Sequence, residues 1–181
     1  YPILIDEEGG RVSRLKKIVD NSVFSGRYFG DLYKKNIKTF NLYFKVYIDQ
    51  ISYVLNLIGV NINTVPVLDL RLKGKSNVIG DRSFSKDPKI VSKIGDYCIK
   101  CFHKNGIGTV IKHIPGHGLA TVDSHHFTPR IKKNENFLLK NDFKAFKNKK
   151  TFFAMTAHII FNQIDKDNTV THSKKMISLI R

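Results

Sequence analysis

The segment from residue 112 to residue 129 gathers side chains that could transfer protons or bind a metal. It reads Lys-His-Ile-Pro-Gly-His-Gly-Leu-Ala-Thr-Val-Asp-Ser-His-His-Phe-Thr-Pro and contains four of the chain's seven histidines. It follows an apolar run and is rich in glycine and proline, which predicts a loop at the end of a strand. Functional residues concentrate on such loops, because a rigid scaffold holds them in place.

Three kinds of site fit this composition. The first is a metal site, although the spacing matches no common zinc pattern and Lys112 would put a cation beside the metal; its ligands would be His113, His117, His125 and His126. The second is a structural loop whose histidines only form hydrogen bonds. The third, which the residues favour, is an acid/base pair in which Asp123 orients His125 and stabilises its charged form.

The elements that must position this loop alternate along the chain. Four apolar runs predict buried strands at residues 2–6, 63–70, 108–114 and 152–161. Between them, apolar residues spaced by three and four predict helices. One helix covers Phe40 to Ile58 and ends before Gly59, the next runs from Asp87-Pro88 to Gly106, and a third covers about 135–147. Ser173 begins another. Inward positions of these helices include Tyr43 and Phe137.

This alternation predicts an α/β fold with a parallel sheet. Polar residues stand at the carboxyl ends of the strands, where such folds place their chemistry: Asp6, Asp69, Lys112, His113 and His158. A TIM barrel typically takes about 250 residues and eight strands. We therefore expect residues 1–181 to be one domain, a partial (β/α)₈ barrel of about four βα units. A nucleotide fold has no support, because neither G-x-G-x-x-G nor a P-loop occurs.

Several motifs resemble one family in sequence order. Lys112-His113-x-Pro115-Gly116-His117-Gly118 followed by Asp123-Ser124-His125 and Pro129 resembles the signature of bacterial β-N-acetylglucosaminidases (β-hexosaminidases) of glycoside hydrolase family 3. Shorter matches lie on both sides of it: Asp6 to Arg14 (usually D-Q-E-G-G-R-V-x-R), Pro66-Val67-Leu68-Asp69, Gly80 to Phe84, and Ala157-His158. Two positions depart from the pattern, since Glu7 replaces a frequent glutamine and Asp81 a frequent asparagine.

The resemblance implies particular roles. Its sugar-binding positions fall on Asp6, Arg14, Arg82, Lys112 and His113, and its acid/base dyad on Asp123 and His125. It implies a retaining exo-glycosidase that removes terminal β-linked N-acetylglucosamine from muropeptides carrying an anhydro-muramic sugar, in cytoplasmic cell-wall recycling. No metal or organic cofactor, nucleic acid or membrane is implied. The family's nucleophile lies in an S-D-D-like segment that this sequence lacks. We therefore expect a fragment without its N-terminal and C-terminal parts, inactive alone.

Two other functions stay open. The chain could be an inactive remnant that still binds sugar, or a basic nucleic-acid-binding module, since its formal net charge is +16. The charge is mostly dispersed lysine, and neither an aromatic-lined basic groove nor a reading helix is evident, which argues against nucleic acid. Cys98 and Cys101 fall within a predicted helix and are interpreted as buried apolar residues. No apolar run reaches the roughly 18 residues of a membrane span.

Overall fold

The computed structural model describes residues 1–72 and 77–181. Its main sheet has four parallel strands in the order β1 (Leu4–Ile5), β2 (Ile62–Asn63), β3 (Gly108–Ile114) and β5 (Phe153–Thr156). Helices lie between successive strands, as parallel pairing requires. The predicted α/β fold, a partial barrel built from a parallel sheet, is confirmed.

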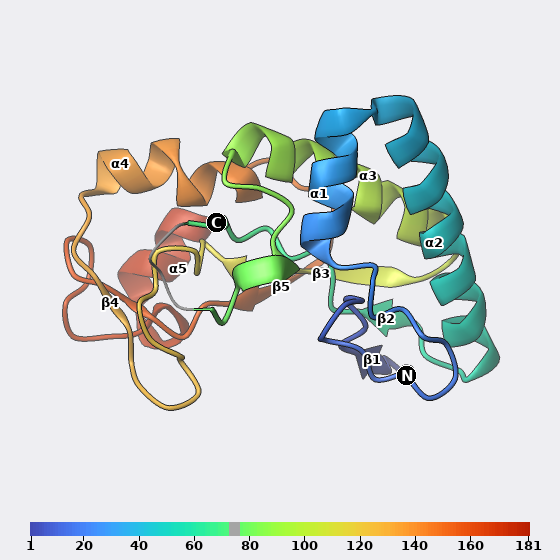
Figure 1. Cartoon of the computed structure of the whole chain (residues 1–181). Helices are drawn as coiled ribbons and strands as arrows, with labels where there is room; N and C mark the ends of the chain where they lie inside the picture. The colour runs from blue at the N-terminus through green and yellow to red at the C-terminus, as the bar shows by residue number, and fades with distance from the viewer. Residues whose placement is uncertain (73–76) are drawn as a thin grey trace.

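Three helices lie together on one side of the sheet (Figure 1): α1 (Gly26–Lys35), α2 (Ile37–Leu57) and α3 (Pro88–Lys104). The Asn36 side chain caps α2 by accepting the N–H groups of Lys38 and Thr39. The predicted start of α3 is confirmed, because Asp87 accepts the Lys89 N–H and Pro88 occupies the first turn. Gly59 follows α2 with a φ of +78°, which glycine adopts without strain.

The main hydrophobic core lies between these helices and the sheet. Aromatic rings from α1 and α2 fill one end of it, and Phe29 and Phe44 have their ring centroids 4.5 Å apart. The α3 face contributes Val91, Ile94, Cys98, Cys101 and Phe102. Both cysteines are unbridged and buried there, as the sequence indicated. Because this core holds the sheet rigidly, polar residues at the ends of its strands are held in place along one edge.

A smaller layer forms the other end of the molecule. Strand β4 (Arg130–Ile131) pairs in parallel with β6 (Ile160–Phe161) outside the main sheet. The remaining helical elements are short: η1 (Gly80–Arg82), α4 (Glu135–Lys140), η2 (Asp142–Phe146), η3 (Val170–His172) and α5 (Lys174–Ile180). This smaller layer has a buried hydrophobic cluster of its own, which includes Leu138, Phe143, Phe161 and Met176.

Three predicted strands are shorter than expected, and the run 2–6 forms only the two-residue strand β1. Of the run 63–70, only Asn63 lies in β2, and the rest forms one isolated parallel bridge between Val67 and Lys112, because Pro66 has no N–H to donate to a ladder. The run 152–161 divides into β5 and β6, which pair with different partners. The helix predicted at about 135–147 likewise divides at Asn141 into α4 and the 3₁₀ turn η2. The sequence also gave no indication of α1 as a separate helix.

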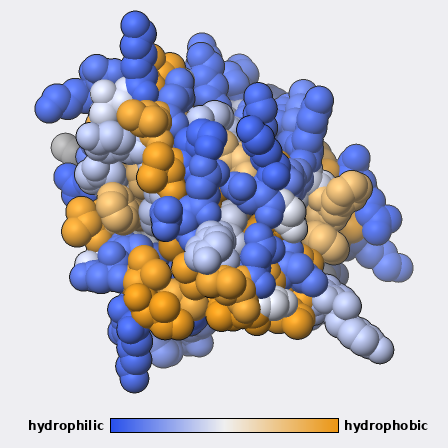
Figure 2. All heavy atoms as spheres, turned by 90° about the vertical axis from the view of Figure 1, so that its right-hand side faces the viewer, coloured by the Kyte–Doolittle hydropathy of each residue, from blue (hydrophilic) through white to orange (hydrophobic). Residues whose placement is uncertain are grey.

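Some apolar positions predicted to face inward are exposed. Tyr43 on α2 is 50% exposed and Phe137 on α4 is 38% exposed. Figure 2 shows the face that carries α2, where hydrophobic residues gather in patches between long hydrophilic side chains. Leu42, Val46, Tyr53 and Leu57 of α2 are also exposed. No helix in the described part of the chain has both the length and the hydrophobicity that crossing a bilayer requires.

Helix α1 approaches the turn after η1 through two glycines. A Cβ on Gly26 would lie 2.1 Å from the Arg82 carbonyl oxygen, and one on Gly30 would lie 1.6 Å from the Phe84 carbonyl oxygen. Only hydrogen at these positions allows the helix backbone and the turn backbone to touch. The Arg82 segment is therefore seated directly against α1.

Candidate functional site

An open cleft of about 560 Å³ lies where the segments after β1, β3 and β5 meet. Because these strands are parallel, their carboxyl ends lie at one edge of the sheet. The cleft lining includes every residue predicted to bind sugar or transfer protons: Asp6, Arg14, Arg82, Lys112, His113, Asp123 and His125. The structure thus brings the seven residues together, and their individual roles stay predictions.

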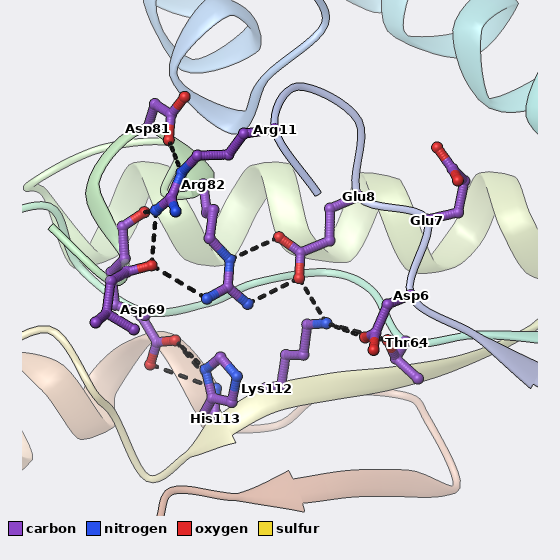
Figure 3. Close-up of polar contacts among 12 residues, drawn as sticks. Asp6, Glu7, Glu8, Arg11, Thr64, Asp69, Asp81, Arg82, Lys112 and His113 are labelled. Atoms are coloured by element: carbon purple, nitrogen blue, oxygen red, sulfur yellow. Dashed lines mark hydrogen bonds and ion pairs between the residues drawn. The ribbon is translucent and has the colours of Figure 1, made fainter. Parts of the chain in front are cut away.

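Lys112 is the centre of the polar network in this cleft (Figure 3). Its side chain is 2% exposed, and Nζ lies 2.7 Å from Asp6 Oδ1 and 2.6 Å from Glu8 Oε1. Nζ also donates to Thr64 Oγ1 at 3.0 Å, and the Thr64 hydroxyl donates to Asp6. Burial alone would raise the pKa of Asp6, but the hydrogen bonds from Lys112 and Thr64 hold it below its ordinary value. The buried ammonium is therefore fully compensated.

Glu8 links Lys112 to Arg82 and was not predicted as a site residue. Its Oε2 accepts from Arg82 Nε and its Oε1 from Arg82 Nη2, both at 2.8 Å, and its side chain is 5% exposed. Burial would raise the pKa of Glu8, yet the Arg82 and Lys112 contacts keep it below its ordinary value. A bidentate pair of this kind fixes the guanidinium plane. The sequence could have indicated this role, because Glu8 is a further carboxylate two residues after Asp6.

The two departures from the family pattern have separate partners. The Glu7 carboxylate points away from Lys112 in Figure 3 and accepts the backbone N–H groups of Arg14 at 2.7 Å and Leu15 at 2.9 Å. It therefore shapes the segment that brings Arg14 to the cleft. Asp81 accepts from Arg11 Nε at 2.7 Å. Neither carboxylate competes for Lys112 or Arg82 among the described contacts.

Asp69 holds the loop after β3 from beneath. It is completely buried, and its carboxylate accepts the backbone N–H of His117 at 2.6 Å and contacts His113 Nδ1 at 2.6 Å. His117 Nε2 lies 3.1 Å from Ser124 Oγ, which ties this loop to the segment that carries Asp123. Burial lowers the pKa of His117. The sequence places Asp69 at the end of a predicted strand but assigns it no role.

Asp123 and His125 form a pair at the mouth of the cleft. Asp123 Oδ1 lies 2.8 Å from His125 Nδ1 and accepts the His125 backbone N–H at 2.8 Å. These bonds lower the pKa of Asp123, the backbone bond most of all. The His125 side chain is 80% exposed. With Nδ1 engaged by the carboxylate, Nε2 is the ring atom available to a bound molecule.

The histidines of residues 112–129 are not arranged as a metal site in the described structure. Across the described ranges, no group of three or more His, Cys, Asp or Glu side chains is placed to hold a metal ion. His158, at the end of β5, lines the cleft and stacks edge-on with His172 at 6.2 Å between ring centroids. The cleft is thus lined by carboxylates, cations and imidazoles, which suits the recognition of a hydroxyl-rich molecule.

One family profile and several named relatives match nearly the whole chain. The profile of the Glycosyl hydrolase family 3 N terminal domain matches residues 2–181. A protein named Beta-hexosaminidase A from Pseudoalteromonas piscicida is 33% identical over 172 residues, which cover 93% of this chain and 28% of the relative. One named Beta-hexosaminidase from Nitrosomonas eutropha is 31% identical over 186 residues, covering 99% of this chain and 52% of the relative.

Solved structures agree with this result. NagZ from Neisseria gonorrhoeae, in complex with N-trifluoroacetyl-D-glucosamine, superposes with a TM-score of 0.87 at 27% identity, covering 97% of this chain and 52% of that one. Zinc-bound CbsA from Thermotoga neapolitana gives a TM-score of 0.85 at 28% identity, covering 99% of this chain and 38% of that one. The chain therefore spans about half, or less, of the length of these relatives.

Proposed function

Because this chain belongs to glycosyl hydrolase family 3, we propose that it supplies the sugar-binding cleft and the acid/base pair of a retaining β-N-acetylhexosaminidase. One observation carries the proposal: the Asp123–His125 pair lines the same cleft as the buried network around Lys112. A proton-transfer group and a set of fixed hydrogen-bonding groups then face one bound molecule. That combination is what hydrolysis of a glycosidic bond requires.

The sugar would be held by side chains that are already fixed. Lys112 and Arg82 are locked by Glu8, and Asp6 by Lys112, so little side-chain freedom is lost on binding. Asp6 accepts from sugar hydroxyls, Arg82 donates to hydroxyl or N-acetyl oxygens, and His113 faces a hydroxyl. Lys112 donates its three N–H groups to Asp6, Glu8 and Thr64 and so orients the carboxylates of the cleft. Two relatives support an N-acetylglucosamine-type ligand, since their names refer to hexosaminidase activity. The bound N-trifluoroacetyl-D-glucosamine of NagZ supports it too.

His125 would act as general acid and then as general base. In a retaining mechanism the acid first protonates the departing oxygen and later removes a proton from the attacking water. Asp123 holds Nδ1, so Nε2 carries the transferred proton, and an imidazole can do this near neutral pH. The proposal assigns no nucleophile within this sequence, because Asp165 and Asp167 do not stand in an S-D-D-like segment.

The finer proposal concerns the substrate. We infer that the enzyme removes terminal β-linked N-acetylglucosamine from muropeptides carrying an anhydro-muramic sugar, within cytoplasmic recycling of the bacterial cell wall. This inference rests on the long motif from Lys112 to Pro129, which resembles bacterial β-N-acetylglucosaminidases. Comparing turnover of such a muropeptide with turnover of chitobiose tests it, and a preference for chitobiose would count against it.

The acid/base assignment is tested with a series of leaving groups in the intact enzyme. His125→Ala should slow hydrolysis of substrates with poor leaving groups about 10²–10⁴-fold, because they need a proton. Activated aryl glycosides should lose much less in the first step, and slow deglycosylation should then produce a pre-steady-state burst. Asp123→Asn should give a weaker version of the same pattern, because the imidazole remains without its charged partner.

His126→Ala is the matched control, since His126 is an exposed neighbour that does not line the cleft. It should leave the dependence on the leaving group unchanged. Equal rate losses across all leaving groups in His125→Ala would mean that His125 positions the substrate, and the acid/base role would have to be abandoned.

A further inference from the structure

We propose that buried Asp69 is a positioning residue that keeps the Nδ1 hydrogen on His113, so that His113 Nε2 is reserved for a hydroxyl of the bound sugar. This inference deepens the proposed function and rests on it, because it assumes that the cleft binds a sugar. Neither the family resemblance nor the comparisons give Asp69 a role. One Asp69 carboxylate is shared among three N–H groups.

The Asp69 carboxylate has no contact with solvent, and its hydrogen bonds within the described part of the chain come from the end of β3 and the loop that follows it. Oδ1 accepts the His117 backbone N–H at 2.6 Å, and the two oxygens lie 3.3 and 3.2 Å from the His113 backbone nitrogen. Oδ2 lies 2.6 Å from His113 Nδ1. Burial alone would raise the pKa of Asp69, but His113 and these donors hold it below its ordinary value.

An ionised carboxylate can only accept hydrogen bonds, so the ring atom that faces Asp69 must carry a hydrogen. His113 therefore has its hydrogen on Nδ1, whether the imidazole is neutral or charged. The His113 side chain is 17% exposed and lines the cleft. Nε2 is the ring nitrogen left for a ligand, and in the neutral ring it accepts a hydrogen bond from a sugar hydroxyl.

The same geometry predicts what Asp69→Asn would do. The position of Oδ1 must remain an acceptor, because the His117 N–H points at it. The amide oxygen would take that place, and the amide NH₂ would take the place of Oδ2, beside His113 Nδ1. Two donors cannot face each other, so the His113 hydrogen should move to Nε2. The variant would then present a donor to the sugar where the native protein presents an acceptor.

Nitrogen NMR of histidine-labelled enzyme reads the tautomer directly and needs no substrate. His113→Gln identifies the His113 signals by their loss. We expect the Nδ1–H form in the native enzyme and the Nε2–H form in Asp69→Asn. Asp142→Asn is the matched control, because Asp142 is also a buried carboxylate beneath this loop but has no bond to His113 among the described residues; it should leave the tautomer unchanged.

Titration with N-acetylglucosamine tests the contact with the sugar. Addition of the sugar should shift the His113 Nε2 signal of the native enzyme, and Asp69→Asn should bind the sugar roughly tenfold more weakly, the usual scale for one mismatched hydrogen bond. An Nε2–H tautomer in the native enzyme would overturn the inference even if Asp69→Asn fails to fold. So would a switched tautomer with unchanged affinity. Absence of any sugar binding by the native enzyme would instead contradict the proposed function, while the tautomer would still decide the role of Asp69.

Discussion

Replacement of Asp142 by asparagine should stabilise the protein at alkaline pH. Asp142 begins η2 and is 1% exposed, and neither of its carboxylate oxygens has a hydrogen-bond partner in the described part of the chain. It packs beneath the loop after β3, where its Cβ would lie 2.7 Å from a Cβ on Gly116. Burial, together with the negative charge of Asp69, raises the pKa of Asp142 from 3.8 to about 7.

The magnitude follows from linkage between proton binding and folding. Below about pH 3 the carboxyl group is protonated in both the folded and the unfolded chain, so it has no effect on stability. As pH rises toward 7, the unfolded chain ionises while the folded protein must retain the proton, and the free energy of unfolding falls. A pKa raised from 3.8 to about 7 corresponds to roughly 4 kcal/mol lost by about pH 8. Asparagine mimics the protonated acid and avoids this loss.

Urea denaturation of the native protein and of Asp142→Asn, across about pH 4 to pH 9, measures the effect. The two proteins should have similar stability at the acidic end, and the variant should gain progressively to a maximum of about 4 kcal/mol at the alkaline end. A stability difference that does not change with pH, or a variant that is less stable at high pH, would show that Asp142 is not held protonated by its surroundings.

Two further predictions concern other carboxylates. Glu8→Gln should lower the free energy of unfolding by roughly 3–5 kcal/mol, because Arg82 and Lys112 would lose their shared buried charged partner. The same variant should bind N-acetylglucosamine more weakly. Native values in calorimetry and in a sugar titration would contradict the structural role of Glu8. Asp165 has its pKa lowered to about 2, chiefly by the Ser173 hydroxyl. Its contribution to stability is therefore present above about pH 4 and disappears as pH falls through about 2, and Asp165→Asn should lose that dependence in an acid denaturation series.

The sequence could predict the fold class and the cleft because both depend on local patterns. Buried parallel strands read as apolar runs, and the residues that follow them share one edge of the sheet. Asp6 and Lys112 could therefore be placed together although they stand far apart in the chain. The start of α3 was equally local, since Asp87 and Pro88 form a cap by themselves.

What the sequence could not provide depends on partners from elsewhere in the chain. The importance of Glu8 appears only when Arg82 and Lys112 meet on either side of its carboxylate. The division of the run 152–161 depends on β4, a short strand with no pattern of its own. The exposure of Tyr43 likewise follows from which face of α2 the neighbouring helices cover, because apolar spacing alone does not define the width of a buried stripe.

The contact of α1 with the end of η1 and the turn after it affects how variants at Gly26 and Gly30 would be interpreted. Gly26 and Gly30 lie in a helix that is not part of the cleft lining, yet the backbone of Arg82 and Phe84 rests directly on them. Any larger residue at either position must displace that turn and, with it, the guanidinium of Arg82. A library screen scored only by sugar affinity would therefore rank residues 26 and 30 among the ligand contacts. The ligand footprint inferred from such a screen would include a helix that the ligand never reaches.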